Sequence, residues 1–382
     1  MKYKNLPLCF MVLLSGASLV ACDNDPSSVT FTFNNLGDNV SIHSEHQEAY
    51  LKDSNYNSIG KYAAYASNEG YADASPVTIS WDVKKAKEYE VLISESDNDW
   101  DNAFTIKTEE MKADFYNAKL NTKYYYKVNA VYKKVNFYSE VQSFTTSDSI
   151  IRNLHYEGID NFRDLGAFKT SSGKSIKQGL IFRSGHFNKA KVNGLEPLVS
   201  DNEIDNIKKQ LNIKTDVDLR KNMLIDGAIE TSGITSSPIH VPNYQQLPMF
   251  YDGENILNHS DSEKNEINKN SIQGFFNLLS KEDNYPIVFH CVQGKDRTGC
   301  LAYLLESLLG VDEKDIMRDY LFTNFSNSVG SPCKESDISM RYGLTIKNYD
   351  GETLQDKAFK YLNEVIGVTQ DNLERIRSIL LG

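Results

Sequence analysis

The 382-residue sequence contains only five cysteines and no run of basic residues. So few cysteines in a chain of this length exclude a disulfide scaffold. The net charge of −11 argues against a nucleic-acid partner and against attraction to an anionic lipid surface. An anionic substrate therefore has to be captured by positive potential that is local to one site.

An apolar run, Leu6 to Val20, follows two lysines near the start of the sequence. It is too short for a convincing membrane-spanning helix and is typical of an export signal, which we place at residues 1–21. The signal ends in Leu-Val-Ala-Cys22, which resembles the lipobox of bacterial lipoproteins. The resemblance implies that Cys22 is acylated, that residues 22–30 form a tether, and that the protein is an exported lipoprotein, membrane-anchored at the periplasmic face or the cell surface. An ordinary cleaved signal with an incidental cysteine is the alternative.

Residues 31–147 carry short runs of alternating apolar and polar residues, separated by turn residues. Their regular spacing predicts an antiparallel β-sandwich. From about residue 76 to 146, the order of Trp81, the strands that follow it and a tyrosine-rich corner resembles a fibronectin type III domain. Residues 31–75 are more than one first strand requires, so we expect them to add a hairpin or a linker. This all-β region has no catalytic grouping, which favours a spacer or a recognition module of unknown ligand.

The most informative stretch runs from His290 to Gly299 and reads His-Cys-Val-Gln-Gly-Lys-Asp-Arg-Thr-Gly. A short apolar run at residues 285–289 precedes it and suits a buried strand, and leucines at helical spacing follow it up to Leu309. In the order strand, tight loop, helix, the N–H groups of the loop and of the first helical turn point into one concavity, and the helix dipole adds positive potential. The sequence therefore predicts an anion-binding cup in this loop.

Cys291 lies at the start of the cup, where the same field favours a thiolate over a thiol. The planar fork of Arg297 suits two non-bridging phosphoryl oxygens. We therefore predict that Cys291 and Arg297 are catalytic. Phosphate binding is predicted for the loop residues Val292, Gln293, Gly294, Lys295, Asp296 and Arg297. A buried structural cysteine beside a surface arginine is the alternative.

The whole stretch resembles the signature loop of the cysteine-dependent protein tyrosine phosphatase superfamily. Its Gly-Lys-Asp-Arg-Thr-Gly half is similar to bacterial secreted phosphatases that accept phosphotyrosine and, in several members, phosphoserine, phosphothreonine or phosphoinositides. Segments 161–166 and 182–184 match the same family. The resemblance implies an α/β phosphatase domain over residues 148–382, with a central, mostly parallel sheet flanked by helices. It implies no cofactor and no metal, because arginine and amide groups supply the positive charge.

Supporting roles are expected for the neighbours of the cysteine. Thr298 can donate a hydrogen bond to the sulfur and ease its departure, while His290 is better placed to tune the thiol through backbone geometry than to act as a base. A general acid must protonate the leaving oxygen. Asp296 in the loop is the first candidate for this acid. Asp252 is the second, on a long segment (243–265) that is expected to form a flap over the site.

Three functions follow from these residues. The lead is a phosphomonoester hydrolase, a protein-tyrosine phosphatase of single or dual specificity that works through a phosphocysteine intermediate. A phosphoinositide or inositol-phosphate phosphatase is the nearest variant, favoured if Lys295 is a mobile cation beside the phosphate rather than a solvated side chain at the rim. A surface-anchored protein that binds phospho-ligands is the alternative of another class. The expected partners are a phosphorylated protein or a phosphoinositide, and the membrane.

The sequence also predicts some local pairings. Arg163 and Asp164 are expected to form an internal ion pair, and residues 239–242 to form a strand. Cys300 is expected to be a small buried residue, with a reversible disulfide from Cys300 or Cys333 to the catalytic cysteine as the alternative.

Overall fold

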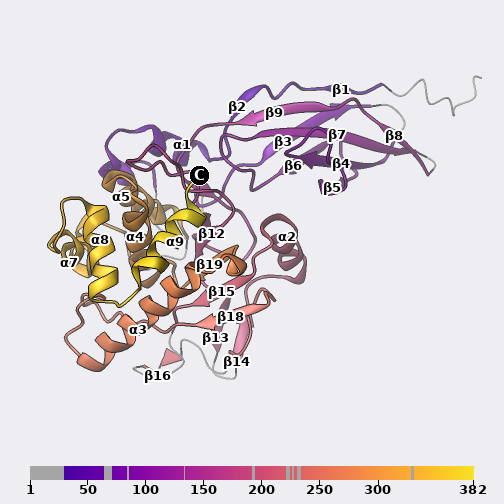
Figure 1. Ribbon diagram of the computed structural model, residues 1–382. Coiled ribbons are helices and arrows are strands. Elements are labelled where there is room, and N and C mark those ends of the chain that lie inside the picture. Colours follow the sequence, from indigo (N-terminus) through magenta and orange to yellow (C-terminus); the bar gives the residue numbers. More distant parts are fainter. Residues whose placement is uncertain are drawn as a thin grey trace, which may run out of the picture.

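The computed structural model describes residues 30–63, 71–83, 86–132, 134–191, 194–220, 224–225, 228–229, 234–327 and 331–382. The predicted export signal, Cys22 and all of the predicted tether but its last residue lie outside these ranges. Within the ranges, no helix is both long enough and apolar enough to cross a membrane. The described chain has an elongated β-structure at one end and a larger body of helices around a sheet (Figure 1).

The N-terminal part is a sandwich of two sheets that share one apolar core (Figure 1). One sheet has the order β1 (Thr32–Phe33), β3 (Val77–Asp82), β6 (Lys112–Phe115). The other has the order β2 (Asp38–Val40), β9 (Gln142–Thr146), β7 (Lys123–Tyr132), β4 (Glu88–Ser94), β5 (Phe104–Thr108), and β8 (Val135–Tyr138) also pairs with β7. Buried residues such as Trp81 and Val91 alternate with more exposed ones along β3 and β4, as strands with one buried face require.

The prediction of an all-β region is wrong between β2 and β3. There the chain forms α1 (Glu45–Lys52) and a 3₁₀ helix, η2 (Tyr56–Lys61), where we expected a hairpin or a linker. The Ser44 side chain caps α1 by accepting a backbone hydrogen bond. Tyr50 and Ile59 bury their side chains in the apolar core of the C-terminal part and not in that of the sandwich. These helices are therefore stabilised by a distant surface that the local pattern does not reveal.

The C-terminal part is organised around a six-stranded sheet. Its order is β10 (Arg152–Asn153), β11 (Arg163–Asp164), β12 (Ile181–Ser184), β19 (Ile287–His290), β15 (Thr215–Asp218), β18 (Asn243–Gln246). From β12 to β18 neighbouring strands run parallel, whereas β10, β11 and β12 pair antiparallel. The sheet is therefore mixed and not mostly parallel as predicted. The links between β10, β11 and β12 contain no helix, and such links favour an antiparallel return.

The strand predicted at residues 239–242 is wrong, because β18 begins at Asn243. β18 lies at the edge of the sheet, and all four of its residues are half-buried and polar or aromatic. An apolar run marks a strand that is buried on both faces, so it did not mark this one. The segment 243–265, which was expected to form a flap, therefore begins with an edge strand and ends in the start of a helix.

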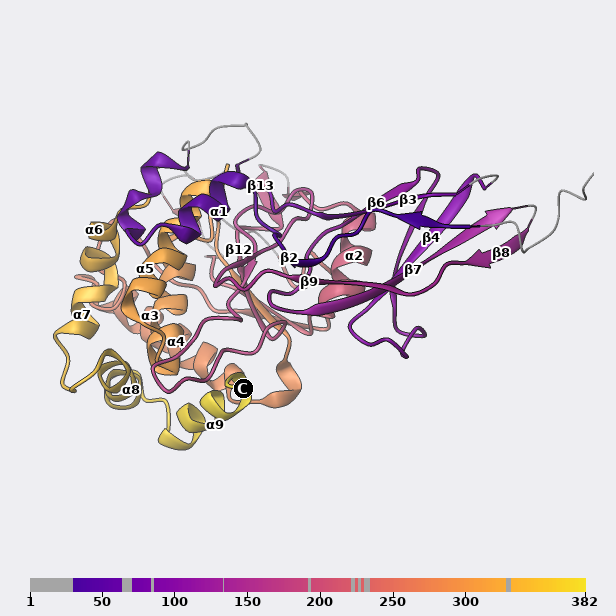
Figure 2. The same ribbon diagram turned by 90° about the horizontal axis from the view of Figure 1, so that it is seen from above.

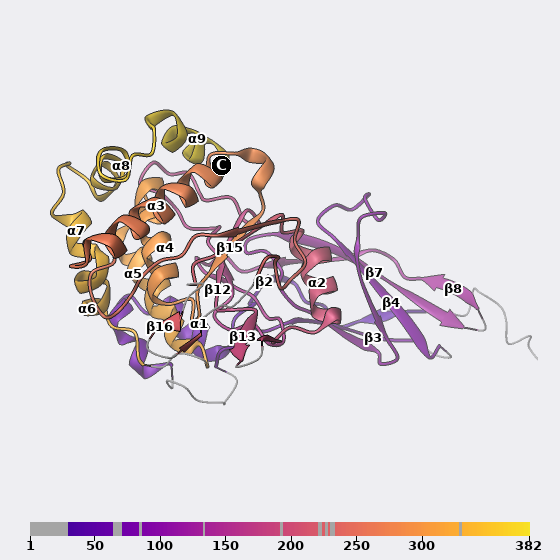
Figure 3. The same cartoon turned by 90° about the horizontal axis from the view of Figure 1, so that it is seen from below.

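Helices surround α4 (Asp296–Leu309), in which every residue from Arg297 to Leu309 is buried (Figure 3). The others in the C-terminal part, among the described residues, are α2 (Asp201–Leu211), α3 (Ser262–Leu279), η3 (Glu282–Asn284), α5 (Glu313–Phe322), η4 (Thr323–Phe325), α6 (Glu335–Ile338), η5 (Ser339–Gly343), α7 (Leu344–Lys347), α8 (Leu354–Glu364) and α9 (Gln370–Leu380). Two small hairpins lie outside the main sheet: β13 (Asn188–Lys191) with β14 (Gly194–Pro197), and β16 (Leu224–Ile225) with β17 (Ala228–Ile229). The helix that follows the predicted loop is thus the centre of the helical body.

Figure 2 shows α1 beside α5, although the two helices are far apart in the sequence. Arg318 of α5 joins them, because its guanidinium donates hydrogen bonds to three backbone carbonyl oxygens. These belong to Tyr50 (2.9 Å), Leu51 (3.3 Å) and Asp53 (2.9 Å). Tyr56 and Asn57 of η2 add hydrogen bonds to a carboxylate of α6. The helical segment of the N-terminal part is therefore bonded directly to the C-terminal part.

We predict that Arg318→Ala lowers the free energy of unfolding by about 2–4 kcal/mol, because it leaves carbonyl oxygens of α1 without their donor in a buried joint. Urea denaturation measures this change. Lys314→Ala removes an exposed cation from the same helix and should change stability by less than about 0.5 kcal/mol. An Arg318→Ala protein as stable as the wild type would show that the joint does not contribute to folding.

Candidate active site

The predicted loop lies between the end of β19 and the start of α4, so the predicted order of strand, loop and helix is confirmed. Gly294 has a φ of 66°, and a Cβ at this position would lie 2.5 Å from the Ser184 carbonyl oxygen at the end of β12. Only glycine fits so close an approach in this conformation. The loop therefore turns tightly across the carboxyl ends of β12 and β19.

Groups outside the loop bind its carbonyl oxygens. The accepting residues are Val292, Gln293 and Gly294. Asn161 Nδ2 donates to the Gln293 carbonyl (2.9 Å), and Arg183 Nη2 donates to the Gly294 carbonyl (2.7 Å). The His186 amide donates to the Val292 carbonyl (3.1 Å). The C=O and N–H of a trans peptide point in opposite directions, so the N–H groups that follow these carbonyls turn away from their support. This is the orientation that an anion-binding cup requires.

Arg183 belongs to a buried charged cluster beside the loop. Arg163 donates from Nε to Asp319 Oδ1 (2.6 Å), and Arg183 donates to the other carboxylate oxygen of the same residue. Arg163 also donates to the Asn161 side chain. Burial alone would raise the pKa of Asp319, but the two guanidinium groups outweigh it and the pKa is lowered. One carboxylate on α5 thus orients both arginines, and through them the loop.

The predicted ion pair between Arg163 and Asp164 is wrong. The two residues are neighbours on β11, and side chains of adjacent strand residues point to opposite faces of a sheet. Arg163 reaches Asp319 on one side, while Asp164 accepts a hydrogen bond from Arg152 Nη1 (2.8 Å) on the other. Each charge is therefore paired, but with a partner from another element.

Cys291 follows β19 directly and is only 3% exposed. Burial alone would raise the pKa of its thiol, but the charge of Arg297 and the hydroxyl and amide of Thr298 favour the thiolate more strongly, so the pKa is lowered. Arg297 is itself buried in the first turn of α4 and donates from Nη1 to Leu219 O at 3.4 Å. The structure thus brings together a thiol of lowered pKa, a guanidinium and the amino end of a helix.

His290 is fully buried and its ring points away from solvent. Its Nε2 lies 3.1 Å from Asp216 Oδ1, and its Nδ1 lies 4.0 Å from Asp218 Oδ1, both on β15. Burial opposes a charge on the ring, but the carboxylates of Asp218 and Asp216 outweigh it and raise the pKa of His290. The side chain therefore has the position of a supporting group inside the sheet.

Asp296 is the first residue of α4 and is paired with Arg341 of η5. Arg341 Nη1 also donates a hydrogen bond to the Tyr320 hydroxyl (3.0 Å). The guanidinium carbon lies 4.9 Å from the centroid of the Tyr251 ring. Burial raises the pKa of Asp296 and outweighs the opposing charges of Arg341 and Lys295. The carboxyl group at the rim of the loop therefore takes up a proton more readily than an ordinary aspartate.

The side chains of two other predicted residues are paired with groups outside the loop. Asp252 pairs with Lys264 and lies 3.7 Å from His259 Nε2, close to the start of α3. Lys295 is 2% exposed, and its Nζ donates to the carbonyl and hydroxyl oxygens of Ser331 (both 2.9 Å). Lys295 is thus neither a mobile cation nor a solvated rim residue, because both expectations left out the burial that the tertiary fold imposes.

Three described cysteines, Cys291, Cys300 and Cys333, are free and buried. Burial raises the pKa of Cys300 and Cys333, in contrast to that of Cys291. Cys300 is the small buried residue that we predicted. Among the described residues, no group of three or more His, Cys, Asp and Glu side chains is placed to hold a metal ion.

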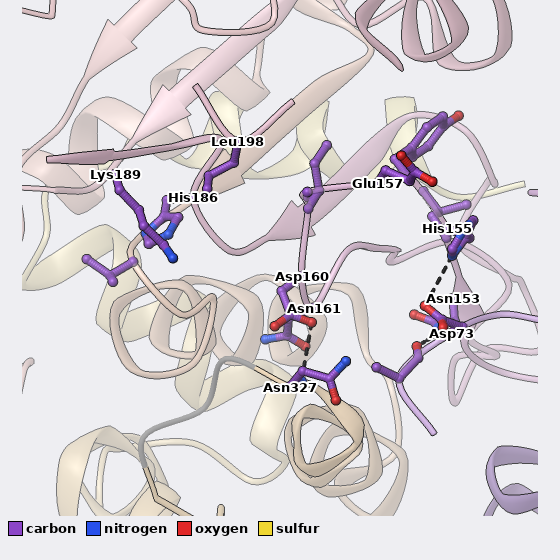
Figure 4. Close-up of a pocket in the computed structure, with 16 residues that line it drawn as sticks. Asp73, Asn153, His155, Glu157, Asp160, Asn161, His186, Lys189, Leu198 and Asn327 are labelled. Carbon is purple, nitrogen blue, oxygen red and sulfur yellow. Dashed lines mark hydrogen bonds and ion pairs between the residues drawn. The ribbon is translucent and has the colours of Figure 1, made fainter. Parts of the chain in front are cut away.

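A cavity of about 400 Å³ adjoins the loop (Figure 4). Val292 and Asn161 form part of its wall, together with residues of the segment 153–160 that leads into β11. Ala72 and Asp73, from the N-terminal part, complete the wall on another side. The cavity thus lies between the two parts of the chain, with Val292 of the loop in its wall.

Fold and site together define a phosphatase-like protein, with a strand, a tight loop and a helix over a mixed sheet. The chain matches the family model described as "Tyrosine phosphatase family" over residues 154–382, more than half of its length, and it belongs to that family. It is similar to a Cupriavidus necator protein assigned as a tyrosine-protein phosphatase, with 26% identity over 180 residues. That match covers 46% of this chain and 64% of the relative. A solved structure of the Siw14 catalytic core is 16% identical, with a TM-score of 0.29, covering 48% of this chain and 86% of that chain.

Sequence reasoning missed Arg341, which pairs with Asp296, and Asp319, which binds the two arginines that stand beside the loop. Both lie on helices that follow α4, far in the sequence from the residues they bind. Asp319 carried a signal, since Ile316 and Phe322 stand three residues before and after it in the sequence and place this acidic residue on the apolar face of the helix. Arg341 carried none, because it lies in a short π-helical turn between an exposed Met340 and a buried Tyr342, without a regular helical pattern.

We predict that alkylation of Cys291 by iodoacetamide rises with pH around a midpoint below that of an ordinary thiol, because its pKa is lowered. Arg297→Met should move the midpoint to higher pH, since the main charge that favours the thiolate is gone. Mass spectrometry of the Cys291 peptide measures the modified fraction. Arg375→Met removes an exposed arginine of α9 and should leave the midpoint unchanged. Equal midpoints for Arg297→Met and wild type would contradict the electrostatic account.

Proposed function

We propose that this protein is a phosphomonoester hydrolase of the protein-tyrosine phosphatase type, with Cys291 as nucleophile. The observation that carries the proposal is the buried, thiolate-favouring Cys291 beside Arg297 at the amino end of α4. A helix amino terminus and a guanidinium both stabilise phosphoryl oxygens. Membership of the tyrosine phosphatase family supports the same chemistry.

In the first step Cys291 Sγ attacks phosphorus and the bond to the leaving oxygen breaks. The loop amides and Arg297 hold the equatorial oxygens, and Asp296 gives its proton to the leaving oxygen. In the second step a water attacks the phosphocysteine, its proton returns to Asp296, and Cys291 leaves as a thiolate. Hydrogen bonds from the hydroxyl and amide of Thr298 to the sulfur favour the departure of the thiolate. Inorganic phosphate and the free alcohol or phenol are the products.

Asp296 is the general acid in this proposal, in preference to Asp252. Its raised pKa favours the protonated form that an acid needs, and it lies at the rim of the loop. Arg341 opposes protonation but also fixes the carboxyl group in place. The Asp252 carboxylate is instead engaged in an ion pair with Lys264 of α3.

Phosphotyrosine, with single or dual specificity, is the proposed substrate group. A phosphoinositide activity was expected to rely on Lys295 as a mobile cation, and the burial of Lys295 against Ser331 removes that support. A protein that only binds phospho-ligands would not need a thiol of lowered pKa beside an arginine. The protein-tyrosine phosphatase function is therefore preferred over both.

We propose further that residues 31–147 include a fibronectin type III-like module. Two features support it: Trp81 packs edge-on against Tyr89 (5.3 Å between ring centroids), and the Tyr124 hydroxyl accepts a hydrogen bond from the Lys119 amide (2.8 Å). The second is the kind of tyrosine corner that such sandwiches contain. The proposed role of the module is spacing or recognition, with a ligand that is still to be found.

The catalytic prediction concerns Cys291→Ser and Asp296→Asn. Cys291→Ser should lower kcat on a phosphotyrosine peptide by at least about a thousandfold, because the serine hydroxyl is a far weaker nucleophile than a thiolate at neutral pH. Asp296→Asn should lower kcat by about 100-fold or more on substrates with poor leaving groups, and much less on p-nitrophenyl phosphate, whose leaving group needs no proton. Steady-state kinetics measures both. Equal losses on the two leaving groups would rule out Asp296 as the acid.

We propose that the protein is an exported lipoprotein acylated at Cys22, as the lipobox-like sequence suggests. Expressed in a diderm bacterium, Cys22→Ala should move the protein from the membrane fraction to the soluble fraction, because each buried methylene of an acyl chain contributes about 0.8 kcal/mol of membrane affinity. Fractionation with immunoblotting measures the distribution. Cys9→Ala, in the leader itself, should remain with the membrane. If the Cys22→Ala protein stays there too, the lipoprotein proposal fails.

A further inference from the structure

Three consecutive residues of α5 bind three different groups of the protein. Arg318 donates hydrogen bonds to backbone carbonyls at the carboxyl end of α1, and Asp319 accepts hydrogen bonds from the two arginines beside the loop. The Tyr320 hydroxyl accepts from Arg341 Nη1 (3.0 Å), and the same nitrogen is paired with Asp296. All three side chains of α5 are buried. The hydrogen-bonded backbone of a helix moves as one body over a single turn, so α1 and both supports of the site share one rigid element.

A second contact joins η2 to α6. The Tyr56 hydroxyl donates to Glu335 Oε1 (3.2 Å), and Asn57 Nδ2 donates to Glu335 Oε2 (2.7 Å). Glu335 is the first residue of α6, and η5 follows α6 directly. The Asp337 carboxylate of α6 lies 3.5 Å from Nη2 of Arg341 in η5. The carboxylate that η2 binds therefore belongs to the same short helical stretch as the arginine paired with the proposed general acid.

We propose that Tyr56 and Asn57 are positioning residues of the active site, which fix α6 and η5 through Glu335 and so hold Arg341 against the carboxyl group of Asp296. The inference rests on the proposed phosphatase function and adds a further requirement of that same site. It assigns to the helical segment of the N-terminal part a role in the protonation of the leaving group.

The stretch that carries Arg341 depends on such support. α6 has four residues and η5 has five, and helices this short are not stable without tertiary contacts. Ile338 and Tyr342 anchor one side of the stretch in the apolar core, whereas Met340 is 62% exposed. Hydrogen bonds to the first residue of α6 therefore add a constraint that the apolar side alone does not supply.

The helical segment of the N-terminal part is a fixed support. The backbone carbonyl of Asp53 accepts a hydrogen bond from Arg318 (2.9 Å). The carboxylate of the same residue accepts from the hydroxyls of Ser58 (2.7 Å) and Tyr62 (2.8 Å), at and just after η2. Tyr50 of α1 is fully buried in the apolar core of the C-terminal part. α1 and η2 therefore form one unit, with α1 beside α5 (Figure 2) and η2 bonded to α6.

The chemical consequence concerns the proton of Asp296. Burial raises the pKa of this carboxyl group, and the charge of Arg341 opposes that rise. When Arg341 moves away, the carboxyl group stays protonated up to a higher pH but is no longer held in one place. Reactions that need its proton then slow, because a general acid has to lie within hydrogen-bond distance of the leaving oxygen. Reactions that need no proton keep their rate.

The test compares wild type with the double variant Tyr56→Phe/Asn57→Ala, which removes both donors to Glu335 and keeps the aromatic ring. Phenyl phosphate and p-nitrophenyl phosphate are the substrates, because they are similar in size and only the first has a leaving group that needs a proton. The variant should lower kcat on phenyl phosphate by about threefold to tenfold, as expected for the loss of one or two hydrogen bonds. Its kcat on p-nitrophenyl phosphate and both KM values should be unchanged. The basic limb of its pH profile on phenyl phosphate should move to higher pH.

A double-mutant cycle with Asp296→Asn separates positioning from a general loss of structure. In the Asp296→Asn background the substitutions in η2 should cause no further loss on phenyl phosphate, because the group that they position is gone. Losses that multiply would overturn the proposal, and so would equal kcat changes on the two substrates. Tyr349→Phe is the matched control, since it also removes a hydrogen bond from a tyrosine to a carboxylate, that of Glu364 (2.8 Å), and should match wild type on both substrates.

Hydrogen exchange gives a readout that needs no activity. Amides of residues 335–343 should exchange at least about threefold faster in the η2 variant than in wild type, because the stretch opens more often. Equal exchange rates would overturn the positioning role, whatever the kinetics. A wild type that hydrolyses neither substrate would instead overturn the proposed function, so the two failures are distinguishable.

Discussion

The active-site loop depends on one buried carboxylate, that of Asp319. It accepts hydrogen bonds from Arg163 and Arg183, and these arginines fix Asn161 and the Gly294 carbonyl. Burying three charges opposes folding strongly, and only close pairing offsets the lost solvation. Because the lowered pKa of Asp319 keeps it ionised, its contribution is present at neutral pH and is lost as the pH falls through its folded-state value. The position of the loop therefore depends on this cluster.

The protein is acidic as a whole, yet its site is built to attract an anion. Arg297, the first turn of α4 and the loop amides concentrate positive potential over a few ångströms, while the carboxylates of Asp216 and Asp218 are held on the inner side of His290. At physiological salt, exposed charges farther away than about 8 Å are largely screened. Local geometry rather than net charge therefore decides what binds at the loop.

Sequence reasoning succeeded where the chemistry is local. A strand, a tight glycine turn and a helix are specified by contiguous residues, so the order around Cys291 could be predicted, and the β-alternation around Trp81 likewise. It failed where the partner is distant in sequence. Arg163 reaches Asp319, and Lys295 reaches Ser331, across long separations that no local pattern encodes. The mixed sheet was missed because strands of two residues leave almost no periodicity to detect.

The helical segment between β2 and β3 changes how the two parts of the chain relate. A sandwich joined only at residues 147–150 would pivot on a short linker, but α1 and η2 leave the sandwich, pack into the phosphatase core and return to it at β3. Three connections in sequence and the buried Arg318 joint then resist rotation. The return stretch carries Asp73 to the wall of the cavity, at a position fixed relative to the loop. A sandwich that was free to pivot could not keep Asp73 beside His155, so the packing of α1 and η2 into the phosphatase core is what holds the two parts in one arrangement.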